Sequence, residues 1–153
     1  MITCSIEPFE KAMVDIYPMS LDHSAEVDKY MDKLEVNADL ERFLQVESLG
    51  SLVTVAARDD DGEMVGYMAV FVTPHLHYKD HLFASTDLLY VVPKHRKDGV
   101  ASKMIALMED HLKTLGVSVF AVAMKEDHRF ESLMKSVGFD KAEIIYSKYI
   151  GED

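Results

Sequence analysis

Residues 90–104 carry the sequence Y-V-V-P-K-H-R-K-D-G-V-A-S-K-M. An apolar run over residues 82–92 leads into this stretch and stops at Pro93, which cannot continue a central β-ladder. Apolar side chains at helical spacing follow over residues 100–115, and Gly116 supplies the C-terminal stop. The pattern predicts a buried strand, a basic loop and an amphipathic helix in succession.

The loop between this strand and this helix has the chemistry of an anion site. Backbone N–H groups in the first turn of a helix have no partner within the helix, and the helix dipole is positive there. Gly99 lets the main chain approach a ligand without a Cβ in the way. The basic side chains nearby are Lys94, His95, Arg96, Lys97 and Lys103. The residues alone leave a second interpretation open, a strand-to-helix turn whose glycine only relieves strain.

The segments on either side predict a mixed sheet. Two β-rich runs at 51–58 and 64–73 surround the D-D-D-G turn, which indicates a hairpin, and residues 74–81 are expected to form a loop. Toward the C-terminus the expected elements are a buried strand at 117–124, a short helix at 128–137 and a last strand at 139–150.

The N-terminal third is expected to be mostly helical. A short first strand is predicted at 2–9, followed by two amphipathic helices between residues 20 and 49 with a break at Asn37. The predicted order is therefore β-α-α-β-β-β-α-β-α-β. The strand, helix and strand over 82–124 imply a parallel crossover, so the fold class is α/β with helices flanking a mixed sheet.

Length and composition fit one domain over residues 1–153. The chain is 48% hydrophobic and 28% charged, and its one cysteine, Cys4, cannot pair within the chain, which favours a reducing compartment. No run approaches the roughly 18 apolar residues that span a bilayer, and the N-terminus is acidic where a signal peptide would be basic. We expect a cytoplasmic protein that does not enter a membrane.

Charge is unevenly distributed along the chain. Residues 1–62 hold 14 Asp and Glu against 5 Lys and Arg, whereas residues 63–153 hold 13 against 11. An acidic front half argues against binding to a nucleic-acid backbone and favours a cationic partner or substrate. A solubilising surface is the alternative interpretation.

The segment R-K-D-G-V-A at 96–101 resembles the acetyl-CoA pyrophosphate loop of the GNAT N-acetyltransferases, [Q/R]-x-x-G-x-[G/A], with Arg96, Gly99 and Ala101 at the three specified positions. It follows a strand ending L-Y-V-V-P and precedes a long amphipathic helix, as in that family. The predicted order of elements is also similar, so the resemblance covers nearly the whole chain. Residues 75–90 further resemble a GNAT subgroup found in phage and prophage genomes.

This resemblance implies a single domain with a splayed sheet that uses acetyl-CoA as the acetyl donor. Backbone groups of Leu89 and Val91 would contact the pantetheine arm. Besides Arg96, the residues implied to bind the cofactor's pyrophosphate are Lys97, Asp98, Gly99, Val100, Ala101 and Ser102. Direct transfer to an amine needs a base for the ammonium, donors for the oxyanion and an acid for the thiolate.

Asp87 is the candidate base because it is the only carboxylate inside the predicted strand at 82–92. It precedes Leu89 by two residues, where similar enzymes place a base, and alternation puts it on the face of Leu89 and Val91. Half-burial would raise its pKa toward a useful value. Binding the substrate ammonium, or capping a backbone group, remains open for the same side chain.

The acid is where the sequence departs from the family. Many GNAT enzymes carry L-Y-x-x-x-G-F in the last helix, and the tyrosine protonates the sulfur of coenzyme A. Here the segment is L-M-K-S-V-G-F, and Met134 cannot donate a proton. Ser132, Ser136 or water would have to replace it, or the thiolate leaves unprotonated. Asp127 stands where the family usually has Asn.

Three histidines form the pattern H-x-H-x-x-x-H at His75, His77 and His81. No flanking set of Cys, Asp or Glu completes a known ligand pattern, so we expect no metal. The side chains expected to bind the acceptor are instead His77, Tyr78 and Glu35.

The sequence thus predicts an acetyl-CoA-dependent N-acetyltransferase acting on a primary amine of a small molecule or protein, and the expected acceptor is cationic. The alternative is a GNAT-like module without catalysis that binds coenzyme A structurally or binds a basic partner protein. A homodimer is left open as a partner assembly, and nucleic acid and membrane are not expected partners.

Overall fold

Two central strands with apolar side chains on both faces set the architecture. The first six residues of β2 (Leu52–Arg58) and of β3 (Met64–His75) are all buried. The computed structural model describes residues 1–152 and places these strands inside the sheet order β1-β2-β3-β4-β5. The remaining strands are β1 (Thr3–Ile6), β4 (Tyr78–Val91) and β5 (Val117–Ala121). The first four are antiparallel neighbours and β4 pairs with β5 in parallel, so the predicted mixed sheet is confirmed.

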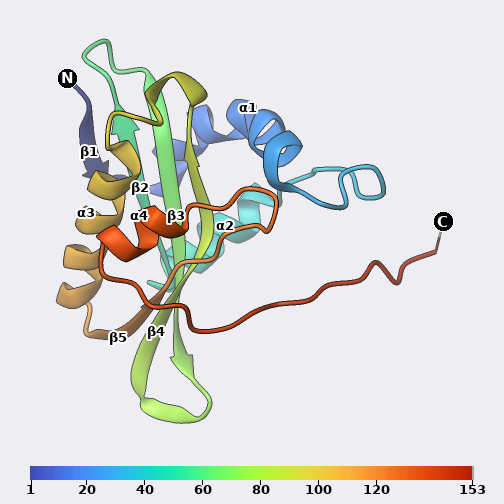
Figure 1. Ribbon diagram of the computed structural model, residues 1–153. Helices are drawn as coiled ribbons and strands as arrows, with labels where there is room; N and C mark the ends of the chain where they lie inside the picture. The colour runs from blue at the N-terminus through green and yellow to red at the C-terminus, as the bar shows by residue number, and fades with distance from the viewer. Residues whose placement is uncertain (153) are drawn as a thin grey trace.

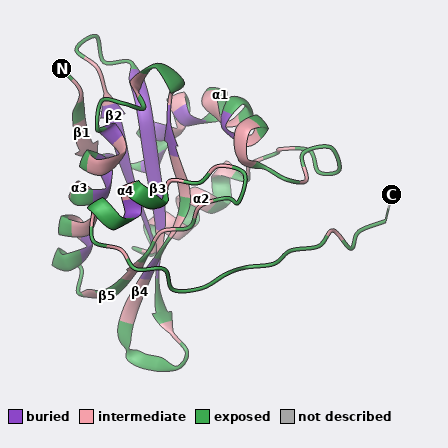
Figure 2. Cartoon of the chain, viewed as in Figure 1, coloured by how far each residue is buried: buried purple, intermediate pink, exposed green. Residues whose placement is uncertain are grey.

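Helices cover both faces of this sheet (Figure 1). α1 (Phe9–Val27) and α2 (Leu40–Ser48) pack on one face, where Phe9, Ile16 and Tyr67 belong to one core. α3 (Val100–Thr114) and α4 (Glu131–Ser136) pack on the other, against a larger core rich in valine and methionine. The α/β domain expected from the sequence is therefore present, with its buried residues concentrated in the sheet between the layers (Figure 2).

One glycine brings α3 close to the sheet. A Cβ on Gly66 would lie 3.0 Å from the Tyr90 carbonyl oxygen and 3.3 Å from the terminal carbon of Met104. Because the first contact is with backbone, a side chain here would push β4 or α3 away. Gly66 thus permits the close approach of β3 to β4 and α3, the two elements that flank the basic loop.

Several predicted elements are confirmed and others have shifted bounds. The hairpin strands β2 and β3 and the helix α3 form where they were expected. The first strand is shorter than the predicted 2–9 because Phe9 opens α1, whose buried residues Phe9, Ala12 and Ile16 follow helical spacing. Residues 28–39, predicted to be helical apart from the break at Asn37, contain no helix. The predicted loop at 74–81 is wrong as well, since β3 and β4 continue into it and leave only a tight turn.

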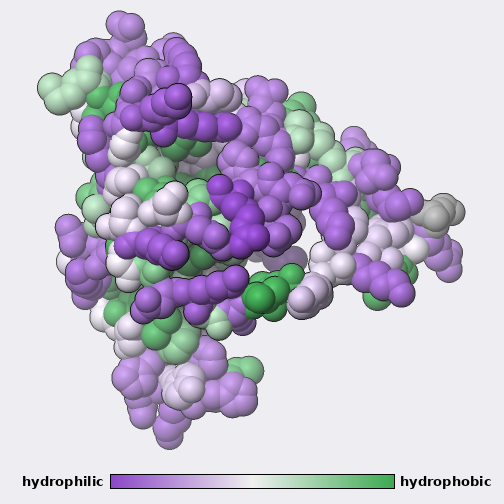
Figure 3. Space-filling model, viewed as in Figure 1, coloured by the Kyte–Doolittle hydropathy of each residue, from purple (hydrophilic) through white to green (hydrophobic). Residues whose placement is uncertain are grey.

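The predicted last strand at 139–150 does not form. Phe139 packs edge-on against Phe120 of β5, with ring centroids 5.4 Å apart, and the chain then runs extended to Glu152 without pairing to any described strand. Its apolar side chains are exposed, including Ile145 at 76% and Tyr146 at 91%. Figure 3 shows an apolar group at the surface where this tail leaves the body. Strand propensity reflects packing within a sheet, and this segment has no neighbouring strand to pack on.

β5 also differs from the buried strand that the sequence predicts. It is the edge of the sheet, and three of its five residues are exposed. None of the helices within residues 1–152 combines the length and apolar character that crossing a bilayer requires.

Candidate functional site

β4 loses one of its two neighbours halfway along its length. β5 pairs with it only from Leu82 to Ser85, and at the next position the Thr86 hydroxyl accepts a hydrogen bond from the Ala123 N–H at 2.8 Å. From residue 87 to residue 91, β4 has β3 on one side and no strand of residues 1–152 on the other. The two strands therefore diverge and leave an open edge.

Asp87 lies where this open edge begins, at a β-bulge. Val70 of β3 pairs with Thr86 and Ala69 pairs with Leu88, so Asp87 has no partner residue in β3. A bulge adds one residue to a strand and redirects its side chains. The bulge explains how a carboxylate occurs next to the apolar C-terminal residues of β4, Leu88 to Val91.

Backbone groups beyond the bulge point alternately toward β3 and toward the open edge. The Val92 N–H donates to the Val65 carbonyl of β3 at 2.9 Å. Strand alternation therefore directs the main-chain groups of Leu89 and Val91 away from β3. The Val91 carbonyl accepts a hydrogen bond from the Arg96 Nε at 2.9 Å, which leaves Leu89 and the Val91 N–H along this edge.

The surroundings of Asp87 alter its acidity. Although solvent reaches the side chain, protein atoms around it raise the pKa of Asp87, and the positive charge of Lys125 opposes that rise. Lys125 belongs to the β5–α4 connection, so its charge acts on Asp87 from the segment that follows β5. A carboxylate with a raised pKa and access to solvent has the properties of a general base.

The open edge leads directly into the N-terminus of α3. A 3₁₀ turn over Pro93–His95 follows β4, and Gly99 then adopts a φ of 71°, in the left-handed region that favours glycine. No side chain of the described residues caps α3, so the N–H groups at the start of its 15 residues are available to a ligand. His95 Nδ1 lies 2.7 Å from an Asp98 carboxylate oxygen, so the side chain of Asp98 has a hydrogen-bonding partner within the loop.

Arg96 is directed into the protein and away from the loop surface. Its Nη2 donates to Glu26 of α1 at 2.6 Å, and its guanidinium lies 5.6 Å from the centre of the Tyr90 ring. The Tyr90 hydroxyl donates to the other Glu26 oxygen at 3.3 Å. The guanidinium that was predicted to contact pyrophosphate therefore ties the loop to α1.

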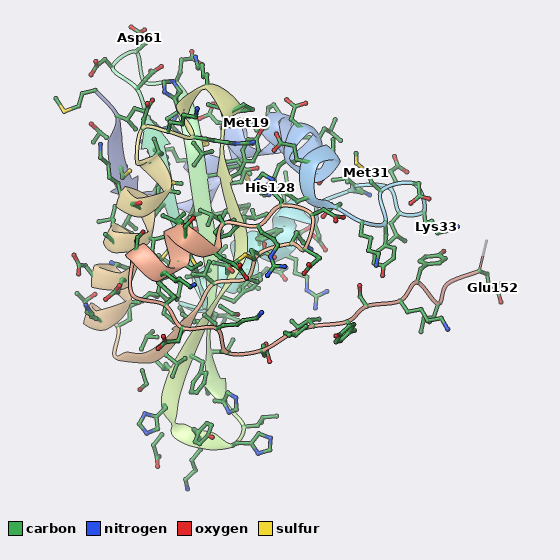
Figure 4. The ribbon with its side chains drawn as sticks, viewed as in Figure 1. Met19, Met31, Lys33, Asp61, His128 and Glu152 are labelled. Atoms are coloured by element: carbon green, nitrogen blue, oxygen red, sulfur yellow. The ribbon has the colours of Figure 1, made fainter. Side chains whose placement is uncertain are left out.

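A buried histidine extends this contact into the core. His23 stacks on Tyr90 at 4.8 Å, and its Nδ1 lies 2.8 Å from the Tyr67 hydroxyl. Burial lowers the pKa of His23, the negative charges of Asp28 and Glu26 oppose this shift, and His128 and Lys125 add smaller lowering effects. Figure 4 shows His128 on the β5–α4 connection near the C-terminal half of α1. Side chains from α1, β4 and this connection thus surround the place where the strands diverge.

The structure separates the side chains expected to bind the acceptor. His77 and Tyr78 lie at the tip of the β3–β4 hairpin, nine or more residues from Asp87 along a strand. At about 3.3 Å per residue this distance is roughly 30 Å, so a small amine cannot contact both places. Glu35 instead lines a pocket of about 600 Å³ with Tyr17 and Leu21 of α1.

Two further predictions concern residues outside the open edge. Met134 is 6% exposed and packs in the core with α3, so it takes no part in proton transfer. His81 has its Nδ1 2.7 Å from the Ser118 hydroxyl, apart from the His75 and His77 pair at the turn. Within residues 1–152 no three His, Cys, Asp or Glu side chains converge as a metal site would require.

The sequence predicted the position of the basic loop before α3 but not the residue of α1 that contacts it. Glu26 appeared only as one acid among many in the front half, because 70 residues separate it from Arg96 and no local spacing links them. Thr86 and Lys125 were missed for the same reason. A signal did exist in His23, which continues the apolar stripe of α1 at a buried position.

Comparison with known proteins agrees with this geometry. The model of the Acetyltransferase (GNAT) family matches residues 12–139. A predicted acetyltransferase with acetyl-CoA from Clostridium acetobutylicum has a TM-score of 0.72 at 15% identity, over 97% of this chain and 96% of its own. Glucosamine-6-phosphate N-acetyltransferase from Arabidopsis thaliana gives 0.72 at 13% identity over 99% of both chains.

A third solved structure has a similar fold. An aminoglycoside acetyltransferase from a soil metagenome has a TM-score of 0.76 at 12% identity, over 99% of this chain and 97% of its own. No curated protein matches the chain. With a family model that covers most of the sequence and a strand that opens onto an uncapped helix, the chain belongs to the GNAT acetyltransferase family.

Proposed function

We propose that this protein transfers the acetyl group of acetyl-CoA to a primary amine. The observation that carries the proposal is the open edge of β4 from residue 87 to residue 91, which ends at the uncapped N-terminus of α3. The edge offers backbone groups to an amide-containing arm, and the helix N-terminus offers N–H groups and a positive dipole to a pyrophosphate. The two features are adjacent, because the open edge of β4 leads through the loop into α3, so one extended ligand could contact both.

The residues of the donor site fit this ligand. Leu89 and the Val91 N–H would bind the pantetheine arm, and Gly99 has no heavy atom within 4 Å of the position of a Cβ, which leaves room for a phosphate. The loop residues that would hold the pyrophosphate are Lys97, Asp98, Gly99, Val100, Ala101 and Ser102. The carboxylate of Asp98 is hydrogen-bonded to His95 within the loop. Acetyl-CoA supplies the activated acetyl group.

Asp87 is the proposed base. An amine attacks only after its ammonium loses a proton, and a carboxylate with a raised pKa accepts that proton more readily than an ordinary one. Asp87 accepts it directly or through a water molecule, because solvent reaches the side chain. The leaving thiolate is proposed to take its proton from water, since Met134 is buried and the Ser136 hydroxyl donates to the Leu133 carbonyl at 2.7 Å.

Glu35 is the proposed contact for a cationic acceptor. It lines the pocket together with Asp32, Lys33 and apolar side chains of α1 and residues 31–36, among them Leu21 and Leu34, so acids outnumber bases in the lining. Such a lining suits an amine with an apolar body and a positive charge. His77 and Tyr78 remain predictions only for an acceptor long enough to extend along the β3–β4 hairpin.

The test combines calorimetric titration with acetyl-CoA and a thiol-release assay over a panel of amines. We expect micromolar binding and release with at least one cationic acceptor. Binding without release for every acceptor would instead support the alternative, a non-catalytic module that holds coenzyme A, which the burial of Met134 favours. The cytoplasmic location, the homodimer and the link to phage-associated relatives remain predictions from the sequence.

Asp87→Asn tests the base directly. The substitution keeps the size of the side chain and removes the proton acceptor, so kcat should fall about 10²-fold or more while the Kd for acetyl-CoA stays near that of the unmodified protein. Asp80→Asn is the matched control, because Asp80 is exposed on the same strand near the hairpin turn. Full activity of the Asp87→Asn protein from pH 6 to pH 9 would remove Asp87 from the reaction.

A further inference from the structure

Arg96 has three contacts, and all of them lie within the protein. Its Nε donates to the Val91 carbonyl, its Nη2 donates to Glu26, and its guanidinium lies over the Tyr90 ring. The first contact joins Arg96 to the end of its own strand. The second joins it to α1, an element of the opposite layer, and among the described residues Glu26 is its only ion-pair partner.

Glu26 also binds Tyr90, so its two carboxylate oxygens serve two residues of the same strand-and-loop unit. The side chains of Glu26 and Arg96 are 29% and 33% exposed, and the Tyr90 ring is buried against them. A surface ion pair between two mobile side chains has little directional constraint. Here both partners have second hydrogen bonds, and this network holds their geometry.

The backbone between Arg96 and α3 is short and already constrained. The Arg96 N–H donates to the Pro93 carbonyl, the Asp98 N–H donates to the His95 carbonyl, and α3 begins one residue after Gly99. With these turn hydrogen bonds in place, the position of the Arg96 side chain determines where the first N–H groups of α3 point. An error of about 1 Å at such donors is enough to weaken an anion contact.

We propose that Glu26 is a positioning residue for the acetyl-CoA loop: by holding Arg96 and Tyr90, it fixes the N–H groups at the start of α3 in the geometry that a pyrophosphate needs. The inference rests on the proposed function for its ligand. Its structural part, the ordering of the loop by a residue of α1, does not depend on that ligand.

The first test uses the free protein and hydrogen exchange. Glu26→Gln keeps the length of the side chain and a hydrogen bond to Tyr90 but removes the charge that holds Arg96. We expect the amides of residues 97–102 to exchange at least about fivefold faster, with no change in the amides of β2. Glu10→Gln is the matched control, because it removes the same charge from an exposed position in the first turn of α1. Unchanged exchange at residues 97–102 would overturn the proposal.

The second test measures ligand binding and kinetics. Glu26→Gln should raise the Kd and the KM for acetyl-CoA about fivefold, whereas kcat and the KM for the acceptor should stay within about twofold. A general loss of structure would move all of these parameters together. An unchanged Kd in the Glu26→Gln protein, or a loss confined to kcat, would contradict a role in positioning the donor loop.

A double-variant cycle separates the pair from its parts. Arg96→Lys loses the planar fork that reaches Glu26 and Val91 at once. If Glu26 acts through Arg96, the double variant should bind acetyl-CoA no more weakly than the weaker single variant, and additive losses would overturn that link. If the unmodified protein does not bind acetyl-CoA at all, the proposed function fails, and the exchange experiment still decides whether Glu26 orders the loop.

Discussion

Two glutamate–arginine pairs flank the ends of α1, and they differ in burial and in location. Glu7 lies just before the helix, is 4% exposed and accepts two hydrogen bonds from Arg58 of β2, at 2.9 and 3.0 Å. Glu26 lies near the end of the helix, is 29% exposed and divides its oxygens between Arg96 and Tyr90. Each arginine is also close to a glycine with positive φ, Gly62 for Arg58 and Gly99 for Arg96.

The contrast separates an ion pair that stabilises the fold from one that shapes a site. Glu7 and Arg58 form a doubly hydrogen-bonded pair in which Arg58 has a second acid, Asp15, at 2.9 Å. The pair connects the start of α1 to the sheet and is distant from the open edge of β4. Glu26 and Arg96 form an ion pair that connects the C-terminal part of α1 to the basic loop. The first pair should therefore affect unfolding and the second should affect ligand binding.

The largest expected effect is on stability. Glu7→Gln leaves Arg58 with one acid instead of two, and the free energy of unfolding should fall by about 2 kcal/mol. For a chain of this size, that loss lowers Tm by roughly 4–8 °C. Thermal unfolding of Glu7→Gln and Glu10→Gln proteins gives the measurement and its control. Equal stability of the two variants would show that the buried pair does not differ from an exposed charge.

The pH dependence of the same pair should follow its acidity. Hydrogen bonds from Arg58 hold the pKa of Glu7 below its usual value. A group with a lowered pKa in the folded state stabilises the fold fully above its unfolded pKa, about 4.3, and loses this contribution as pH falls through the folded pKa. The stability difference between the unmodified protein and Glu7→Gln should be constant from pH 6 to 8 and shrink below about pH 4. Denaturant titrations at each pH test this, and a difference that persists to pH 2.5 would contradict it.

A smaller effect is expected from the two glycines. Gly62 and Gly99 have φ values of 82° and 71°, and neither has a heavy atom within 4 Å of a Cβ position. Valine at either position should therefore cost similar backbone strain. Gly99→Val should also weaken acetyl-CoA binding about tenfold, which is about 1.4 kcal/mol, whereas Gly62→Val should leave the Kd unchanged. Calorimetry of both variants provides the comparison, and equal affinities would place the ligand away from Gly99.

Much of the fold follows from local sequence patterns. The apolar run before Pro93 forms a strand, although β4 begins at Tyr78, before the predicted start at residue 82. The periodic stripe of α3 forms a helix with nearly the predicted bounds. The start of α1 was misplaced because Phe9, its first buried residue, is also the last residue of the predicted strand at 2–9. The strand predicted at 139–150 does not form, because its β-prone side chains have no neighbouring strand to pair with in the part of the chain that the structure describes.

The sequence could predict those parts of the candidate site that depend on neighbouring residues, but not those that depend on contacts between distant residues. Gly99 and Asp87 could be placed because a turn and a strand set their positions from the neighbouring residues. The bulge at Asp87 depends on its pairing with β3, and the role of Arg96 depends on Glu26 in another layer. Contacts between residues that are far apart in the sequence produce no local pattern of residue types, so a single sequence does not predict them.

The parallel pairing of β4 with β5 has a consequence for the order in which the molecule assembles. β2, β3 and β4 are joined by short turns, so their ladders form between neighbouring segments. The β4–β5 pair can form only after the intervening chain, with α3, has crossed the sheet. Contacts between distant segments form late because loop closure must come first. We therefore expect the edge that is proposed to bind the acetyl donor to appear last in refolding and to open first under mild denaturation, so that binding is lost while the three-stranded meander still persists.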